Sequence, residues 1–293
     1  MAIEPTAILA AHPAPLGGKL TLPYQKEHEA EVISAVRKFA QSFNSRSKVV
    51  ADMSTLVEAT SQLSLTNLEY WERLIRWEFS KEIKSSMPPK WKFWAQSTPF
   101  LTWIDLCSAN GFKREKTLRT LYGAAPNSFF FALAVRRLND WVNQVREAAR
   151  NALPIIAKST NPEIVVDVLC ATFPHWNSWG RMDDKDKQVL LEITAIEEVG
   201  YPLKTRILSA TSGPMTSILS QAGRTEILDS YLEEFAIKAI QPSVRAKSYR
   251  CLLEGKMVWF AGRKWVWTDK RYCVGHFEPI LCERKLLVTS HFL

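Results

Sequence analysis

Apolar residues recur along most of this chain at the spacing of an amphipathic helix. Val32, Val36, Phe39 and Phe43 follow one another at three- or four-residue intervals, which places them on one face of a helix that begins near Tyr24. A second stripe of this kind consists of Leu68, Trp71, Leu74, Ile75 and Phe79, with Thr66 or Asn67 as the N-cap. Another helix is expected over 48–64. Pro88-Pro89 should end this first group of helices, because proline cannot continue a helix.

The same periodicity predicts a succession of helices in the rest of the chain. They are expected at about residues 100–110, 113–123, 127–139, 142–158, 162–173, 184–198, 202–210, 214–221, 224–239 and 243–254. Asn110-Gly111 is a suitable helix stop, and Ser159 or Asn161 before Pro162 is a suitable helix start. Ser212-Gly213-Pro214 should separate two helices.

Residues 257–270, MVWFAGRKWVWTDK, depart from the helical pattern. Trp265 and Trp267 alternate with polar or branched neighbours, which predicts a short strand or an aromatic-rich loop. The end of the chain, KLLVTSHFL, resembles the start of another apolar helix. Because an open array of helices needs a polar cap, we expect residues 280–293 to dimerise or to begin a repeat array that continues further.

The helical segments contain an internal repetition. NQVREAARNAL at 143–153 aligns with PSVRAKSYRCL at 242–252, so that Val145-Arg146 lies over Val244-Arg245. KREKTLRTLYGAA at 113–125 is a fainter copy. One helical hairpin cannot bury its apolar face alone, so repetition of this kind favours stacked neighbours that share a continuous core.

This pattern, D-x-x-x-x-V-R-x-x-A-x-x-A-L, resembles the second-helix signature of HEAT repeats. The residues that match it are Asp140, Val145, Arg146, Ala149 and Ala152-Leu153. LNDWVNQVREAA also resembles a variant found in uncharacterised bacterial HEAT-like proteins. The resemblance covers about residues 100–254. It implies an all-α superhelix of stacked antiparallel helix pairs, an armadillo-like α-solenoid, and carries no activity with it.

The resemblance also implies a role for Arg146. In HEAT repeats a loop aspartate and this arginine pack in a ladder between successive repeats. Asp140, or Asp167 in the next unit, is the expected partner, because a charge inside such a stack needs a carboxylate. The alternative is an arginine on a solvated face.

These patterns divide the chain into four parts. They are an extended arm at 1–23, an N-terminal helical region at 24–95, HEAT-like repeats at 96–256, and a Trp-rich basic segment at 257–293, with an incomplete repeat as one interpretation of the last.

Composition favours a cytoplasmic protein. The five cysteines are scattered and odd in number, which argues against a disulfide framework. The first residues lack a basic leader, and no apolar run approaches the roughly 18 residues of a membrane span. Of the net charge of +8, the last third holds most, with 14 Lys and Arg against 8 Asp and Glu in residues 201–293. Such an excess marks an anionic partner or only aids solubility.

Catalytic and metal-binding motifs are absent from the sequence. It contains no phosphate-binding glycine loop, HExxH, CxxC or GxSxG motif. Cys273, His276 and Cys282 are the nearest approach to a zinc cluster, but their spacing is irregular and ordinary cysteines are expected. The acidic run at 183–186 suits a helix N-terminus better than a divalent-ion site. We therefore expect no catalytic residue, cofactor or metal.

Tryptophan is the unusual residue, with 11 copies. The candidate partner-binding residues lie in two aromatic-basic segments and are Trp176, Trp179, Arg181, Trp259, Arg263, Lys264, Trp265 and Trp267. Aromatic rings beside cations suit a protein hot spot, and they also suit a nucleic-acid groove. A satellite core beneath a long loop is a third interpretation.

From these observations we expect a non-enzymatic interaction or scaffold module that binds a protein partner on its helical-repeat surface. The alternative is a nucleic-acid-binding HEAT-like protein that uses its C-terminal basic region. Some HEAT-like proteins are alkylpurine DNA glycosylases, so an enzyme of this type is one form of the alternative. No membrane partner is expected.

Overall fold

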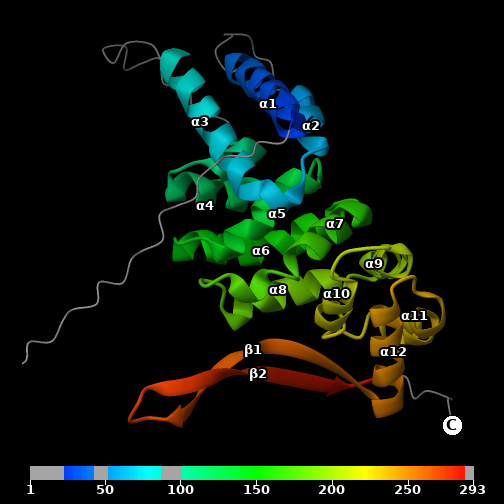
Figure 1. The fold of residues 1–293 in the computed structure, drawn as a ribbon. Helices are drawn as coiled ribbons and strands as arrows, with labels where there is room; N and C mark the ends of the chain where they lie inside the picture. Colours follow the sequence, from blue (N-terminus) through cyan, green and yellow to red (C-terminus); the bar gives the residue numbers. More distant parts are fainter. Residues whose placement is uncertain (1–22, 43–51, 87–100, 288–293) are drawn as a thin grey trace, which may run out of the picture.

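A computed structural model describes residues 23–42, 52–86 and 101–287 of the chain (Figure 1). This part forms a stack of helices followed by one long antiparallel hairpin. The helices are α1 (Pro23–Ser42), α2 (Ser54–Ser61), α3 (Leu68–Ser86), α4 (Gly111–Thr120), α5 (Ser128–Arg136), α6 (Asn143–Ser159), α7 (Pro162–Thr172), α8 (Asp184–Thr194), α9 (Glu197–Ser209), α10 (Met215–Ala222), α11 (Leu232–Lys238) and α12 (Pro242–Glu254). Short 3-10 turns are η1 (Leu65–Asn67), η3 (Trp103–Cys107), η4 (Arg137–Asn139), η5 (Trp176–Ser178) and η6 (Asp229–Tyr231).

Helices two apart in the chain pack against each other and build two rows. In one row α4 contacts α6, and α6 contacts α8. In the other row α5 contacts α7, α7 contacts α9, and α9 contacts α11. The layers follow one another from α1–α3 at one end to α10–α12 and the hairpin at the other (Figure 1). The prediction of a largely helical protein with paired helices is thus confirmed.

The core lies between the two rows and is rich in aromatic side chains. Phe129, Phe130 and Phe131 of α5 are almost completely buried, and so are Phe173 and Trp176. The helical stripes predicted near the N-terminus face this core too. Val32, Val36 and Phe39 of α1 and Trp71 and Ile75 of α3 are buried, while Phe43 lies outside the described residues.

Several helix boundaries follow from capping residues. Asn161 accepts a hydrogen bond from the Glu163 amide with Pro162 in the first turn, as predicted. Asp183 and Asp186 form a capping box at the start of α8, which confirms that the acidic run is a helix N-terminus. Asn110 was expected to stop a helix but is the N-cap of α4, because its side chain accepts from the Phe112 amide.

Two predicted helices are interrupted in the structure. The segment 184–198 contains the end of α8 and the start of α9, since the chain turns at Ala195 and Ile196. Glu197 and Glu198 occupy the first turn of α9, where carboxylates complement the helix dipole. The segment 224–239 is likewise divided into η6 and the short α11.

Residues 256–285 form a β-hairpin, which corrects the all-α expectation. Strand β1 (Lys256–Asp269) pairs antiparallel with β2 (Val274–Lys285). Of the strand and the aromatic-rich loop predicted at 257–270, the strand is therefore confirmed. The helix expected from residue 285 does not begin there, because Lys285 is the last residue of β2. A bulge shifts the register between Phe260 and Gly262.

Some predictions fall on residues that the structure does not describe. These are the extended arm up to residue 22, the part of the expected 48–64 helix before residue 52, the stop at Pro88-Pro89 and the last residues 288–293. Within the described ranges, no helix combines the length and the apolar character needed to cross a membrane.

Candidate functional site

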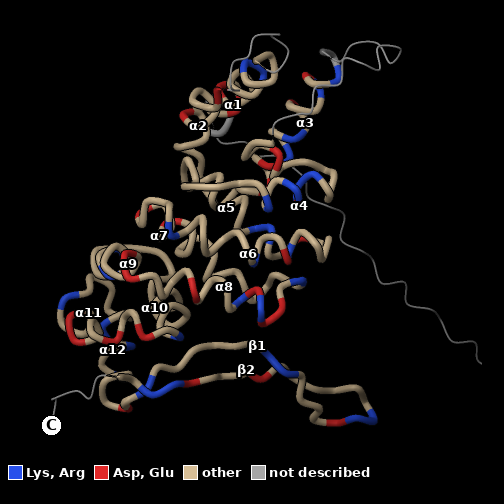
Figure 2. Tube along the Cα trace, turned by 180° about the vertical axis from the view of Figure 1, so that it is seen from behind, with Lys and Arg blue, Asp and Glu red and all other residues tan. Residues whose placement is uncertain are grey.

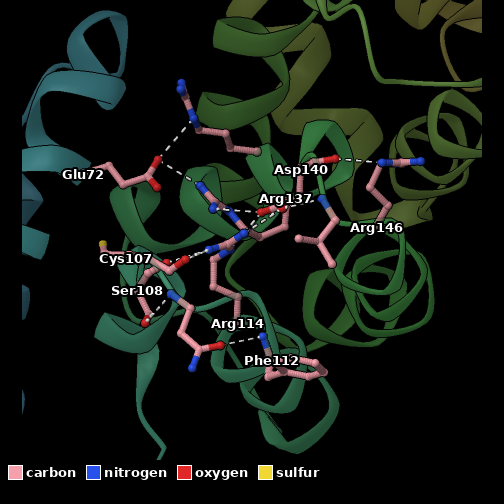
Figure 3. A network of polar contacts seen from close by, with 12 residues as sticks. Glu72, Cys107, Ser108, Phe112, Arg114, Arg137, Asp140 and Arg146 are labelled. Atoms are coloured by element: carbon pink, nitrogen blue, oxygen red, sulfur yellow. Dashed lines mark hydrogen bonds and ion pairs between the residues drawn. The ribbon is translucent and has the colours of Figure 1, made fainter.

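A buried network of arginines and carboxylates joins three layers of helices (Figure 3). Asp140 lies between η4 and α6. Its two oxygens accept hydrogen bonds from Arg114 of α4, at 2.8 Å each. Arg137 of η4 donates to the same carboxylate at 3.1 Å, and the Val142 amide donates at 3.0 Å. All four groups belong to the region where the sequence resembles a HEAT repeat.

Glu72 of α3 extends this network toward the N-terminal helices. Its buried carboxylate pairs with Arg76 at 2.5 Å, Arg137 at 2.8 Å and Arg136 at 3.2 Å. Arg137 therefore bridges two buried carboxylates, Glu72 on one side and Asp140 on the other (Figure 3). Such sharing satisfies buried charges that would be costly alone.

The environment lowers the pKa of Asp140. Burial by itself raises the pKa of this carboxyl, because the charged form loses solvation. The hydrogen bonds from Arg114 and the Val142 amide, together with the charge of Arg137, outweigh that effect and bring the pKa below its ordinary value. Asp140 is thus held ionised by its partners.

The prediction that Arg146 pairs with a carboxylate is wrong. Arg146 donates to the main-chain carbonyl of Asp140 at 2.8 Å and to the Asn143 side chain at 3.0 Å. Asp167 pairs instead with Arg206 of α9. The Asp140 carboxylate faces Arg114 and Arg137, so Arg146 meets only its backbone (Figure 3).

The contact of Arg146 recurs in two further helices. Arg114, Arg146 and Arg245 are each the fourth residue of their helix, α4, α6 and α12. Each guanidinium donates to the carbonyl six residues earlier, on Ser108, Asp140 and Ala239 respectively. These are the three segments that the sequence aligned, so the repetition in sequence has a matching repetition in contacts.

The C-terminal hairpin has one face toward the helices and one face away from them. Met257 and its cross-strand neighbour Arg284 are on the inner face: Met257 is fully buried, and Arg284 binds Asp229 and the Gly223 carbonyl. Side chains alternate between the two faces, and directly paired residues share one face. Allowing for the register shifts at Phe260/Gly262 and Trp267/Asp269, the outer face carries Val258, Phe260, Arg263, Trp265, Trp267, Phe277, Pro279 and Leu281, with Lys256, Glu283 and Lys285 at the end near the helices.

The outer face is largely apolar and exposed. Phe277 and Leu281 are each 61% exposed, and Trp265 and Trp267 are 40% and 48% exposed. The rings pack on one another: Trp265 meets Trp267 at 5.6 Å and Phe277 at 4.9 Å between centroids, both edge to face. Trp265 also lies against Gly275, where a Cβ would come within 2.6 Å of the ring.

The predicted partner-binding residues lie in different places. Trp265, Trp267, Arg263 and Lys264 are exposed on the hairpin, where Lys264 pairs with Glu278 at 3.4 Å on the inner face. Trp176 is fully buried, so it is not available to a partner.

Trp179 and Trp259 are half-buried against the core. The guanidinium of Arg224 makes cation–π contacts with Trp176 and Trp259. Its central carbon lies 4.9 Å from the centroid of the Trp176 ring and 5.4 Å from that of the Trp259 ring. Two of the predicted tryptophans therefore belong to a packed seam between the helices and the hairpin, as the satellite-core interpretation had it.

Arg181 lies with a different group of residues. It lines an open pocket of about 410 Å³ together with Glu69, Glu72, Arg73, Arg76, Ala109, Arg114, Arg136, Arg137, Asn139, Asp140 and Trp141. We call this site the arginine pocket. Sequence inspection missed it because its arginines come from four separate segments whose proximity no local pattern reveals.

The cysteine and histidine residues of the hairpin do not form a metal site. His276 and Cys282 are six residues apart on an extended strand, which separates them by about 20 Å. Among the described residues, no group of three or more histidine, cysteine or acidic side chains is placed to hold a metal ion.

Comparison with known proteins adds no family or relative. No protein-family model, curated protein or solved structure matches the chain.

Proposed function

We propose that this chain is a HEAT-like helical-repeat protein that acts by binding a partner protein on the outer face of its C-terminal hairpin. The observation that carries this proposal is the exposed apolar strip of Trp265, Trp267, Phe277 and Leu281 on one face of the hairpin. The helical layers would serve as the scaffold that presents it.

Two observations support the solenoid part of this proposal. Helices two apart in the chain pack in rows, which is how stacked repeats share a core. The recurring contact of Arg114, Arg146 and Arg245 occupies the same helix position each time. Repeated contacts of this kind are expected where one structural unit has been copied along the chain.

The hairpin has the properties of an interaction surface. An isolated two-stranded sheet is marginally stable in water, and long exposed strands with apolar faces invite pairing. Contiguous exposed apolar patches on soluble proteins commonly mark binding sites. Tryptophan and arginine dominate binding hot spots, and Arg263 lies within the strip beside Trp265.

The ring packing favours a protein over a nucleic acid on this face. Base stacking needs open aromatic faces. Trp265 is edge to face with two other rings and lies against Gly275, so the cluster presents a continuous apolar surface rather than separate platforms. A partner with an apolar segment complements that surface.

Site-specific photo-crosslinking in cells of the source organism tests this proposal. A photoreactive phenylalanine analogue at Leu281 reports on the outer face, and one at His276 reports on the inner face of the same strand. We expect one defined protein to crosslink from position 281 and not from 276. Trp265→Glu with Phe277→Glu should abolish that crosslink, because burying two carboxylates in an apolar interface is strongly unfavourable.

The matched control is Phe112→Glu with Tyr122→Glu, two aromatic residues that are highly exposed in or just after α4. This control should crosslink as the unaltered protein does. Equal crosslinking from positions 276 and 281, or crosslinking that survives the Trp265 and Phe277 changes, would contradict docking on the outer face. A crosslink between two copies of this chain would identify the partner as a second copy.

A second candidate function, nucleic-acid binding by the hairpin, rests on its charge. Lys and Arg lie along β1 and at the turn (Figure 2). The side chains of Arg263, Lys270, Arg271 and Lys285 form no ion pair with the described residues. Titration with labelled single- and double-stranded DNA at low and physiological salt separates the two functions. Strong salt dependence that Arg263→Glu removes would favour nucleic acid, since phosphate contacts release counterions.

A further inference from the structure

The arginine pocket carries more positive charge than its carboxylates neutralise. Its lining includes the guanidinium groups of Arg73, Arg76, Arg114, Arg136, Arg137 and Arg181, but only three carboxylates, those of Glu69, Glu72 and Asp140. The formal excess of six minus three is +3 in one open hollow. Such a concentration of cations attracts anions and raises their local concentration.

The inner half of the pocket is a fixed framework. Glu72 accepts from Arg76, Arg136 and Arg137, and Asp140 accepts from Arg114 and Arg137. Arg114 and Arg137 are buried, and Arg114 also donates to the Ser108 and Ala109 carbonyls. The two buried carboxylates are therefore saturated with arginines and cannot neutralise a further cation.

The outer half of the pocket has unused donors. Arg73 is 67% exposed, and among the described residues its side chain pairs only with the exposed Glu69, at 3.7 Å. The guanidinium of Arg181 makes no hydrogen bond or ion pair within the described parts of the chain. The Arg181 amide donates to the Asn139 side chain at 3.0 Å, which holds this residue at the rim. Arg136 is one-third exposed and faces Glu69 at 3.3 Å.

One aromatic side chain lies beside these donors. Trp141 lines the pocket and is 73% exposed, which is unusual for so large a ring. It follows Asp140 directly, so the framework that fixes Asp140 also fixes the backbone of Trp141. An exposed indole face beside cations is a platform on which a planar base can stack.

We propose that the arginine pocket binds a nucleoside phosphate, with the phosphate between Arg73, Arg136 and Arg181 and the base on Trp141. The guanidinium fork matches phosphate oxygens in pairs, and a multiply charged anion suits the +3 excess better than a single carboxylate. The unit can come from a free nucleotide or from a single nucleic-acid strand. The site is distinct from the hairpin and does not depend on the function proposed for it.

Fluorescence anisotropy of the full chain tests this site with three probes. They are an ATP analogue with a fluorescent ribose substituent, a short labelled oligothymidylate, and unlabelled tripolyphosphate as a competitor without a base. We expect binding at low salt that weakens as salt rises, since the rim charges are exposed. Arg73→Glu with Arg181→Glu should weaken both labelled probes by about tenfold or more, because each removes a charge-assisted hydrogen bond.

Trp141→Ala distinguishes binding of the base from binding of the phosphate. It should weaken the ATP analogue and the oligothymidylate by about tenfold, the range of a lost stacking contact, while tripolyphosphate competes unchanged. All three altered residues are exposed or rim residues, so circular dichroism should show an unaltered fold. Lys158→Glu, at an exposed position in the last turn of α6 and outside both proposed surfaces, is the matched charge control and should bind all probes as the unaltered chain does.

A free nucleotide and a nucleic-acid strand, the two possible sources of the nucleoside phosphate, predict different orders of affinity for these probes. Tighter binding of the oligothymidylate than of the ATP analogue identifies a strand, and the reverse identifies a free nucleotide. Absence of binding at low salt, or equal binding by the Arg73 and Arg181 variant, would overturn the site. Equal loss on Lys158→Glu would show non-specific attraction and overturn the site, and an unchanged affinity of Trp141→Ala would overturn the nucleoside part. None of these results alters the crosslinking expected at the hairpin.

Discussion

At the scale of single residues, the arginine–carboxylate network holds four of the eight buried charged side chains in the described part of the chain, those of Glu72, Arg114, Arg137 and Asp140. Asp140 sits at the centre because Arg114 and Arg137 reach it from different elements. Neither arginine is exposed. Asp140 is the one carboxylate that Arg114 pairs with among the described residues, whereas Arg137 is shared with Glu72. Removing one member of such a group leaves the others uncompensated, which costs far more than losing a surface pair.

Asp140→Asn should therefore destabilise the protein by about 3 kcal/mol or more, because Arg114 and Arg137 lose a buried counter-charge. Urea unfolding followed by circular dichroism measures this change. Glu254→Gln is the control. It breaks an exposed pair with Arg250 inside α12 and should cost less than about 0.5 kcal/mol. If the two substitutions lowered the unfolding free energy equally, the buried network would stabilise the protein no more than an exposed ion pair does.

The lowered pKa of Asp140 predicts how the destabilisation caused by Asp140→Asn depends on pH. A carboxyl whose pKa is lower in the folded state stabilises the protein above its unfolded pKa of about 3.9. That stabilisation disappears as the pH falls through the folded-state pKa. The difference in unfolding free energy between the unaltered chain and Asp140→Asn should be constant above about pH 5 and shrink below about pH 4. A difference that grows on acidification would contradict the lowered pKa.

The same residues show what local sequence patterns can and cannot predict. The V-R pattern marked Arg146 as special and Asp140 as its neighbour, and both do interact. The pattern did not tell which atoms meet, because the direction of the Asp140 carboxylate is decided by Arg114 from a different helix. Arg114 itself lies in the faintest copy of the repeat, so sequence similarity alone gave little reason to choose it.

At the scale of elements, the hairpin is anchored at one end only. Near the helices, Met257 is packed in the core, and Arg284 pairs with the buried carboxylate of Asp229 at 2.5 Å. Beyond the bulge at Phe260 and Gly262, most side chains of both strands are exposed, and the strands run out past α8 (Figure 1). The distal half thus adds surface to the molecule while adding little core.

Shortening the hairpin tests this division. Replacing residues 261–280 with an Asn-Gly turn joins Phe260 to its partner Leu281. We expect the helical circular dichroism signal to remain and the unfolding free energy to change by less than about 1 kcal/mol, because few buried contacts are lost. Arg284→Met at the anchored end should cost about 3 kcal/mol by leaving Asp229 buried and unpaired. A large loss from the shortened hairpin would show that its distal half supports the fold.

The two strands of the hairpin differ in how clearly their sequence patterns predict a strand. Alternation of Trp265 and Trp267 marked β1. In β2 the run from Phe277 to Leu281 is interrupted by Glu278 and Pro279, which hides the strand pattern, and the KLLV that begins at Lys285, its last residue, resembled the start of a helix. Short apolar runs of this kind do not separate strand from helix, and only the pairing with β1 decides it.

At the scale of the whole molecule, the layers form a chain of neighbours. Helix α5 contacts α2, α3, α6 and α7, whereas α11 near the other end contacts α9, α12 and η6. The helical character of these layers could be predicted from periodicity, since amphipathic stripes are local. The hairpin, the arginine pocket and the division of the predicted 184–198 helix depend on contacts between distant segments, which periodicity does not contain.

A layered molecule should respond to damage according to position. In a stack where each unit contacts its neighbours, a defect at an end frays that end, while a defect in the middle weakens units on both sides. Phe130 of α5 and Phe235 of α11 are both fully buried, so the same change to alanine at each site compares middle and end. Each substitution should cost about 3–5 kcal/mol locally.

Amide hydrogen exchange followed by mass spectrometry resolves the two responses. Phe235→Ala should speed exchange in α11, α12 and the hairpin and leave α4, α5 and α6 near their original rates. Phe130→Ala should speed exchange across α3 to α7 and in the layers beyond. Proline-free peptides from α6, whose Val145 and Ala149 are buried, give the most direct comparison of the two variants. Uniform acceleration by both substitutions would mean that the helices unfold as one block, and the stacked-repeat organisation that we propose would have to be replaced by a single cooperative bundle.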